Sequence, residues 1–142
     1  MQTATIKWTG ARNFLATMPS GHTVPFDADR ESHAASSPME MLLAALGACT
    51  SVDVVLILEK KRQVLTSLEV VISGERATEP PAVWTKIDMV YRLKGKLDER
   101  AVRNAIELSQ TKYCSVAAML GKTAKIAYRY EILPEKPYPS AL

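Results

Sequence analysis

Apolar and polar residues alternate along the first 27 residues in a way that predicts an antiparallel meander. Segments 3–10, 13–19 and 22–27 each show the strand period, and turn residues such as Gly10 and Gly21 separate them. Residues 28–37 are small and polar and show no period. We therefore expect a loop there, of a length that often borders a functional site.

A long helix is predicted directly after this loop. Ser37 is a good N-cap, Pro38 suits the first helical position, and Glu40 completes a Ser-x-x-Glu capping box. The helix should extend over residues 38–62. Because residues 39–58 are apolar on nearly every helical face, we expect this helix to run through the middle of the fold.

Two strand patterns follow the central helix. Residues 68–76 and 83–95 alternate between apolar and polar side chains, and a turn-rich segment at 77–81 separates them. This arrangement predicts an antiparallel hairpin with one buried face.

The last third of the chain predicts two helices and a strand. Asp98 is expected to cap an amphipathic helix over residues 99–113 that packs on the outside of the core. A short apolar helix should occupy 114–124, ended by Gly121, and 125–133 reads as a final strand. The expected fold class is therefore α+β.

Size and charge limit the function classes. The chain has 142 residues, 47% of them hydrophobic, which supports one compact domain over residues 1–133 followed by a Pro-rich tail at 134–142. The net charge of +3 arises from 18 basic and 15 acidic residues spread along the chain. Because nucleic-acid binding requires basic residues clustered on one face, we expect no nucleic-acid partner.

The location of the protein is predicted from its apolar runs. The first thirty residues lack a basic region followed by an unbroken apolar run, so no export signal is expected. The long apolar run over 39–58 is interrupted by Asp53 and small polar residues, and we expect it to fall short of a membrane span. The predicted location is the cytoplasm, with no membrane partner.

The two cysteines, Cys49 and Cys114, are the residues with the clearest chemical potential. Without a secretion signal they should be reduced at rest, which leaves a core, metal-binding or reactive role. They lie 65 positions apart in the sequence, a separation that excludes a CxxC motif and fits no common zinc spacing, and both histidines, His22 and His33, lie upstream. We expect neither a metal nor a cofactor.

Local context distinguishes the two thiols. Cys49 is surrounded by small and apolar residues and, taken alone, would be an inert core residue. Cys114 lies where one helix ends and another begins, so the helix N-terminus and nearby Lys112 are expected to lower its pKa. A two-cysteine peroxidase needs an attacking thiolate, a second thiol that condenses with the sulfenic acid, and a cation. The residues alone leave open which cysteine attacks.

Two motifs link the chain to a known family. SPMEMLLAALGACTSVDVV at 37–55, followed by KYCSVAAML at 112–120, resembles the OsmC/Ohr family of osmotically inducible and organic-hydroperoxide-resistance proteins, most nearly its YhfA-like branch. The resemblance extends to about Leu133. It implies an OsmC-like fold in which strongly curved antiparallel sheets wrap around central helices in an intertwined homodimer. It also implies that Cys49 attacks the peroxide and Cys114 resolves the product.

The resemblance suggests two further site residues. Family peroxidases place an arginine from the N-terminal meander beside the attacking thiol, and Arg12 lies near that position. They hold the arginine with a glutamate directly after the proline of the central helix, where this chain has Met39. Glu40, about 100° further round the helix, is a candidate for this role. The alternatives are an exposed turn arginine at Arg12 and a purely capping role for Glu40.

Asp53 lies one helical turn after Cys49, on the same face. A carboxylate there would oppose thiolate formation unless it is itself paired with a cation. We expect Asp53 to be a buried, hydrogen-bonded polar group of the helix.

The predicted function is thiol-dependent reduction of hydroperoxides in oxidative or osmotic stress defence. The resemblance implies organic hydroperoxides as substrates and a lipoylated protein or small dithiol as reductant. A first alternative is a protein of the same fold that binds a small ligand or senses oxidants without turnover. A second is a structural dimer with inert cysteines. Repeated peroxide consumption would distinguish the peroxidase from both alternatives.

Overall fold

The computed structural model describes residues 1–135, and the rest of the predicted tail, residues 136–142, lies outside them. The chain divides into two compact units, the first Met1–Ala44 and the second beginning at Ala45. A single domain over residues 1–133 stays a prediction.

The first unit contains the predicted meander. Strands β1 (Thr5–Gly10), β2 (Asn13–Thr17) and β3 (Thr23–Asp27) pair antiparallel in the order β1-β2-β3. The prediction from alternation is confirmed for all three strands.

The loop after β3 is organised around the carboxylate of Asp27, which is only 3% exposed. This carboxylate accepts hydrogen bonds from the Ser32 hydroxyl and from the backbone N–H groups of Asp29 (2.8 Å) and Ala34 (3.0 Å). The Ser32 hydrogen bond, followed by that of Asp29, holds the pKa of Asp27 below its ordinary value. The segment predicted as a loop is therefore held in place by hydrogen bonds to the buried Asp27 carboxylate.

Helix α1 (Pro38–Lys60) begins where the capping box predicts. The backbone N–H of Ser37 donates to Glu40 Oε2 at 2.8 Å, and the N–H of Glu40 donates to Ser37 Oγ at 3.3 Å. These reciprocal bonds satisfy two N–H groups that the helix itself leaves without partners.

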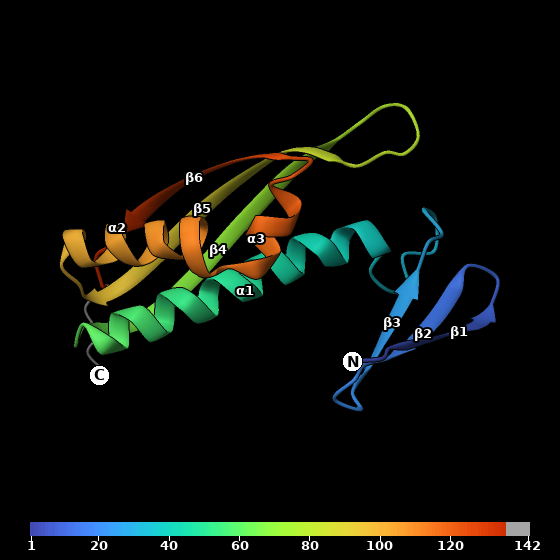
Figure 1. The fold of residues 1–142 in the computed structure, drawn as a ribbon, viewed down its shortest axis with the longest axis horizontal. Coiled ribbons are helices and arrows are strands. Elements are labelled where there is room, and N and C mark those ends of the chain that lie inside the picture. Colours follow the sequence, from blue (N-terminus) through green and yellow to red (C-terminus); the bar gives the residue numbers. More distant parts are fainter. Residues whose placement is uncertain (136–142) are drawn as a thin grey trace, which may run out of the picture. The chain divides into compact units, whose positions relative to one another are not determined.

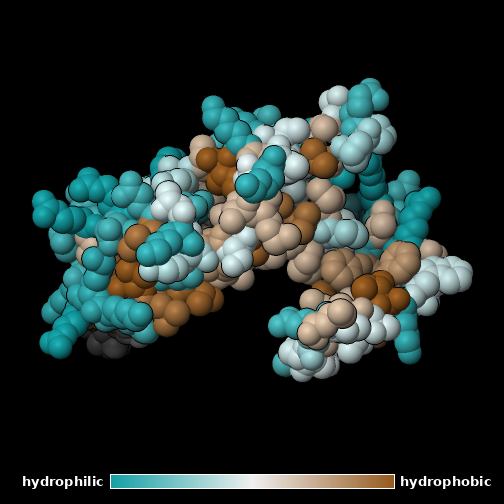
Figure 2. All heavy atoms as spheres, viewed as in Figure 1, coloured by the Kyte–Doolittle hydropathy of each residue, from teal (hydrophilic) through white to brown (hydrophobic). Residues whose placement is uncertain are grey.

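The expectation that α1 runs through the middle of the fold does not hold for the single chain. Its buried residues form one row spaced four apart, namely Leu46, Thr50, Val54 and Leu58. On another face Val52 is 56% exposed and Leu56 is 51% exposed, and apolar surface is visible along α1 in Figure 2. The sheet covers only one side of the helix.

By length and composition alone, α1 could also cross a membrane. The core helix of a soluble protein passes the same test. The sequence-based expectation that the run over 39–58 falls short of a span is therefore not supported by length. The absence of a membrane partner stays a prediction.

The second unit contains a three-stranded sheet in the order β4-β5-β6. Strands β4 (Val64–Arg76) and β5 (Trp84–Lys96) form the predicted antiparallel hairpin. Strand β6 (Lys125–Ile132) pairs parallel to β5, so this sheet is mixed and the expectation of purely antiparallel sheets is wrong here. The reason is the helical connection between β5 and β6, which returns the chain to the starting end of β5.

Three helical segments form that connection. Helix α2 (Glu99–Leu108) continues into a π-helix, η1 (Ser109–Tyr113), and α3 (Ser115–Leu120) follows. The predicted helix over 99–113 thus changes its hydrogen-bonding pattern at Ser109. Asp98 occupies the N-cap position of α2, but its side chain makes no capping hydrogen bond, contrary to expectation.

The core of the second unit lies between the helices and the sheet. Figure 1 shows α1 and α2 on the same side of the sheet. Alternate residues of β5 are buried there, and so is one face of α2. These residues are Ile87, Met89, Tyr91, Leu93, Ala101, Val102, Ala105 and Ile106. The amphipathic pattern predicted for α2 is confirmed.

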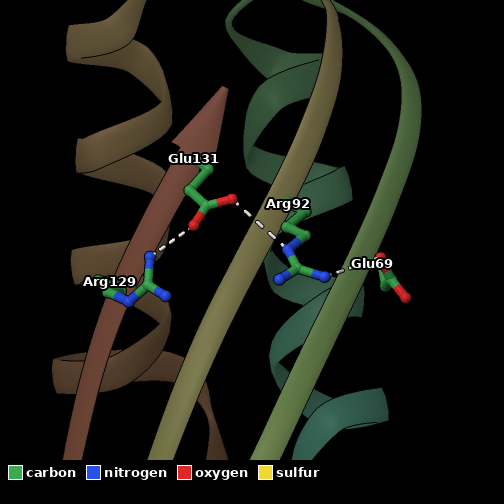
Figure 3. A network of polar contacts seen from close by, with 4 residues as sticks. All are labelled: Glu69, Arg92, Arg129 and Glu131. Carbon is green, nitrogen blue, oxygen red and sulfur yellow. Dashed lines mark hydrogen bonds and ion pairs between the residues drawn. The ribbon is translucent and has the colours of Figure 1, made fainter. Parts of the chain in front are cut away.

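Charged residues cover the opposite face of this sheet (Figure 3). Arg92 pairs with Glu131 at 3.5 Å and with Glu69 at 3.9 Å, and Arg129 pairs with Glu131 at 2.6 Å. The hydrogen bond from Arg129 lowers the pKa of Glu131 below its ordinary value. Exposed ion pairs of this kind contribute little to stability. We therefore interpret this face of the sheet as a solvent-exposed surface.

Gly95 is expected to tolerate no side chain. Its φ is +140°, and a Cβ there would lie 1.9 Å from the backbone oxygen of Val64. Gly95→Ala should therefore lower the free energy of unfolding by more than about 2 kcal/mol, because backbone must move. Urea denaturation measures this. Gly21→Ala is the control, since its φ is +90° with no atom within 4 Å. Equal losses in the two variants would contradict the clash.

Candidate functional site

Cys49 and Cys114 come together in the second unit. Cys49 lies in the middle of α1 and is half-buried, while Cys114 precedes α3 and is 3% exposed. Both are free thiols, and Cys49 is close enough to Cys114 to contribute to the raised pKa of Cys114. Packing of the helices onto one face of the sheet thus unites two thiols that are far apart in the sequence.

The π-helix determines where Cys114 lies. The Cys114 N–H donates to the carbonyl of Ser109, five residues earlier, at 2.8 Å. The chain then turns into α3, and Cys114 Sγ accepts the N–H of Ala117 at 3.4 Å as the N-cap of that helix. Cys114 is therefore held through its backbone on one side and its sulfur on the other.

The pKa of Cys114 moves in the direction opposite to the sequence-based expectation. Burial of the thiol, and then the neighbouring Cys49 thiol and the Asp53 carboxylate, raise the pKa of Cys114 to about 11. The Ala117 N–H acts the other way but is outweighed. Lys112, the expected cation, lies over the ring of Tyr113, 5.2 Å from its centroid. Cys114 is accordingly a protonated thiol at neutral pH.

A chain of hydrogen-bonded polar side chains joins α1, β5 and the π-helix near the two cysteines. Thr50 Oγ1 is 2.6 Å from the Tyr91 hydroxyl and 2.7 Å from Ser109 Oγ, and all three residues are fully buried. The Ser109 hydroxyl donates to Asp53 Oδ2 at 2.9 Å. The Gln110 amide donates to the Tyr91 hydroxyl at 2.6 Å.

These contacts refine the sequence-based interpretation. Asp53 is hydrogen-bonded as expected, although it is only half-buried. Thr50, Tyr91, Ser109 and Gln110 were not predicted as site residues. One signal was present in the sequence, since Ser109 is a polar residue on the apolar face of a predicted amphipathic helix.

Arg12 and Glu40 belong to the first unit, and both side chains are exposed. The Arg12 carbonyl accepts the N–H of Ala28 at 3.0 Å, and its guanidinium forms no ion pair with the residues that the structure describes. The Glu40 carboxylate has a complete explanation as the capping box partner of Ser37. Roles for these two residues in the site stay predictions. Among residues 1–135, no three His, Cys, Asp or Glu side chains cluster as metal ligands would.

The alkylation of Cys114 is expected to be slow at neutral pH and to accelerate as the pH rises toward 11. The thiolate is the reactive form, so the rate should rise about tenfold per pH unit between about pH 7 and 10. Iodoacetamide labelling followed by peptide mass spectrometry measures each cysteine separately, with circular dichroism as the control for folding at each pH. A Cys114 rate that reaches a plateau below pH 9 would contradict the raised pKa.

Comparison with known proteins gives consistent matches over most of the chain. Residues 30–129 match the family described as OsmC-like protein. Protein YhfA of Escherichia coli K12 is 41% identical over 131 residues, which is 92% of this chain and 97% of YhfA. Two solved structures share the fold. A hypothetical protein from Aquifex aeolicus has a TM-score of 0.86 at 29% identity, covering 96% of this chain and 98% of that one. The organic hydroperoxide resistance protein OsmC from Legionella pneumophila has a TM-score of 0.70 at 13% identity, covering 92% and 96%.

Proposed function

Because the chain belongs to the OsmC-like protein family and has an α+β OsmC-like fold, we propose that it is a thiol-dependent peroxidase. In this proposal Cys49 attacks the hydroperoxide and Cys114 resolves the product. The structural relative from Legionella is named as an organic hydroperoxide resistance protein, but at 13% identity that likeness supports only the fold. The activity itself depends on the site.

The observation that carries the proposal is that two free thiols, Cys49 and Cys114, come close together in the second unit. Burial keeps the Cys114 thiol protonated at neutral pH, so Cys114 is poorly suited to attack a peroxide itself. Cys49 is also the more exposed thiol, so a peroxide can reach it more readily. The raised pKa of Cys114 and the greater exposure of Cys49 therefore both support Cys49 as the attacking residue.

The proposed reaction conserves atoms and electrons in three steps. The Cys49 thiolate attacks the outer peroxide oxygen, an S–O bond forms as the O–O bond breaks, and Cys49 becomes a sulfenic acid. The alkoxide that leaves takes a proton from water and becomes an alcohol. The Cys114 sulfur then attacks Cys49, an S–S bond forms, and the hydroxyl leaves with the Cys114 proton as water. A dithiol finally reduces the disulfide by exchange and is itself oxidised.

The substrate and reductant classes come from the family resemblance. Organic hydroperoxides are the proposed substrates, and a lipoylated protein or small dithiol is the proposed reductant, acting in the cytoplasm where free thiols persist. Arg12 is the candidate cation beside Cys49, with Glu40 as its candidate holder. Glu40 is the weaker of the two, because its carboxylate already accepts the Ser37 N–H.

A homodimer is part of the proposal. The exposed apolar side chains Val52 and Leu56 lie four residues apart on α1, and Cys49 lies three residues before Val52. Exposed apolar side chains that share one helix face often mark a surface covered by a partner. A second copy of α1 packed along this stripe would bury it and would place Cys49 near the subunit interface.

The test is consumption of cumene or tert-butyl hydroperoxide by the purified protein with excess dithiol. We expect many equivalents of peroxide to be consumed per protein chain. No consumption beyond the uncatalysed rate would reject the peroxidase. Hydrogen peroxide in a parallel assay tests the preference for organic substrates.

An oxidant sensor is the second candidate, and one observation favours it. Cys114 is only 3% exposed, which limits how readily a reductant can reach the Cys49–Cys114 disulfide. A sensor would consume one equivalent of peroxide and stop with dithiol present. The number of turnovers in the same assay therefore separates the two functions.

A further inference from the structure

The buried polar chain beside the cysteines has a definite direction. A carboxylate only accepts hydrogen bonds, so the single Ser109 hydroxyl proton is committed to Asp53. Thr50 must then donate to Ser109, and Tyr91 must donate to Thr50. Gln110 supplies the last donor, to the Tyr91 hydroxyl. Every proton points toward Asp53, an arrangement in which each bond polarises the next.

The hydrogen-bonded polar chain includes the first two residues of the π-helix, Ser109 and Gln110. The side chain of Ser109 ties the π-helix to α1 through Thr50 and Asp53, and the side chain of Gln110 ties it to β5 through Tyr91. The carbonyl of Ser109 accepts the Cys114 N–H at 2.8 Å. Ser109 thus joins the polar chain with its side chain and Cys114 with its backbone.

A π-helix is less stable than an α-helix and persists where the surroundings support it, often at functional sites. The α-helical pattern of residues 99–113 would continue through Ser109 if side-chain contacts did not intervene. In an α-helical turn the residues after Ser109 would rotate, and Cys114 would move relative to Cys49. The buried contacts of Ser109 and Gln110 are the described interactions that tie this turn to both α1 and β5.

We propose that the directed chain Gln110–Tyr91–Thr50–Ser109–Asp53 holds the π-helical turn in the register that keeps the Cys114 thiol against Cys49. Ser109 is then a positioning residue for disulfide formation. The inference rests on the proposed pairing of Cys49 with Cys114 as a redox pair. It adds four residues, Thr50, Tyr91, Ser109 and Gln110, whose role is to set the approach of the two sulfurs.

The test measures the Cys49–Cys114 disulfide at equilibrium with oxidised and reduced dithiothreitol, which requires no peroxide. The oxidised fraction gives the effective concentration of one thiol at the other. We expect Ser109→Ala to lower this quantity about tenfold or more, because the turn loses buried hydrogen bonds to Thr50 and Asp53. Thr111→Ala is the matched control, since the Thr111 hydroxyl donates only to the Glu107 carbonyl within the helix. It should change the equilibrium by less than about twofold, as an exposed local contact does.

Three further variants, at Tyr91 and Asp53, keep the proposal falsifiable. Tyr91→Phe keeps the buried ring and removes the link to Gln110, so it should shift the equilibrium in the same direction and decides the matter if Ser109→Ala does not fold. Asp53→Asn keeps an acceptor for Ser109 and should retain most of the effective concentration, whereas Asp53→Ala should not. Circular dichroism and thermal melting establish which variants are folded.

The outcomes separate this inference from the proposed peroxidase. A folded Ser109→Ala protein with the wild-type equilibrium overturns the positioning role, as does an equal loss in Thr111→Ala. A wild-type protein that forms no disulfide in the redox buffer also overturns it. A wild-type protein that forms the disulfide with the expected Ser109 dependence, but consumes no peroxide, rejects the peroxidase and leaves the positioning role supported.

Discussion

Cys49→Ser is expected to abolish hydroperoxide turnover. Serine at this position has no thiolate to attack the O–O bond, so the rate with excess dithiol should fall by at least about a thousandfold, as it does when an enzyme loses its nucleophile. Peroxide consumption is followed with cumene hydroperoxide under the conditions used for the wild type. The oxygen of serine is close in size to sulfur, so the fold should be retained.

Cys114→Ser should behave differently, and this difference assigns the roles. Without a resolving thiol, Cys49 should be oxidised once and stay as a sulfenic acid, which dimedone traps as an adduct visible by mass spectrometry. If Cys114→Ser lost the first oxidation and Cys49→Ser kept it, the two roles would be reversed.

Ser51→Ala is the control for changes in this helix. The Ser51 hydroxyl donates to the Gly47 carbonyl at 2.6 Å, within α1 itself. Its removal leaves every hydrogen bond of the cysteine site in place, so turnover should stay within about twofold of the wild type. A large loss in Ser51→Ala would mean that the assay reports helix stability rather than chemistry.

The double variant Val52→Lys and Leu56→Lys is expected to convert a dimer into monomers. In the proposed dimer these two positions are buried in both copies, so four charged groups would enter an apolar interface. The loss of apolar burial and the cost of burying charge should together raise the dimer dissociation constant by at least about a hundredfold. Analytical ultracentrifugation over a concentration series measures this constant.

Val71→Lys is the control for this surface. Val71 is 37% exposed on β4 and lies on the opposite face of the strand from Ile72, whose side chain lies close to Gly47 of α1. The same apolar-to-lysine change there should leave the dimer intact. A wild-type protein that is monomeric at micromolar concentration would reject the dimer, and wild-type protein that sediments with phospholipid vesicles would indicate a membrane as the cover of α1.

The sequence by itself determined the features that depend on near neighbours. The capping box of Ser37 and Glu40 marks the first turn of α1, because an N-cap needs only residues three positions apart. The alternation along β5 correctly identified its buried face, because successive strand residues point to opposite sides. The two motifs that contain the cysteines were enough to predict the family, and the comparisons confirm it.

Tertiary structure alone decided how distant residues meet. The hydrogen bond of Thr50 with Ser109 joins positions 59 apart, and that of Thr50 with Tyr91 joins positions 41 apart. The parallel pairing of β6 and the π-helical turn at Ser109 depend on the same packing. Ser109 on the apolar face of its predicted helix was a local signal for a buried polar group, but local propensity does not identify its partners Thr50 and Asp53.

The pKa of Cys114 shows the physical reason most directly. Its place before a helix led to the expectation of a lowered pKa, and the N–H of Ala117 at that helix N-terminus does act in this direction. Burial, the neighbouring Cys49 thiol and the Asp53 carboxylate oppose that local effect and outweigh it. Sequence determines the local donor, whereas the surrounding dielectric and charges exist only once α1, the π-helix and the sheet have packed together.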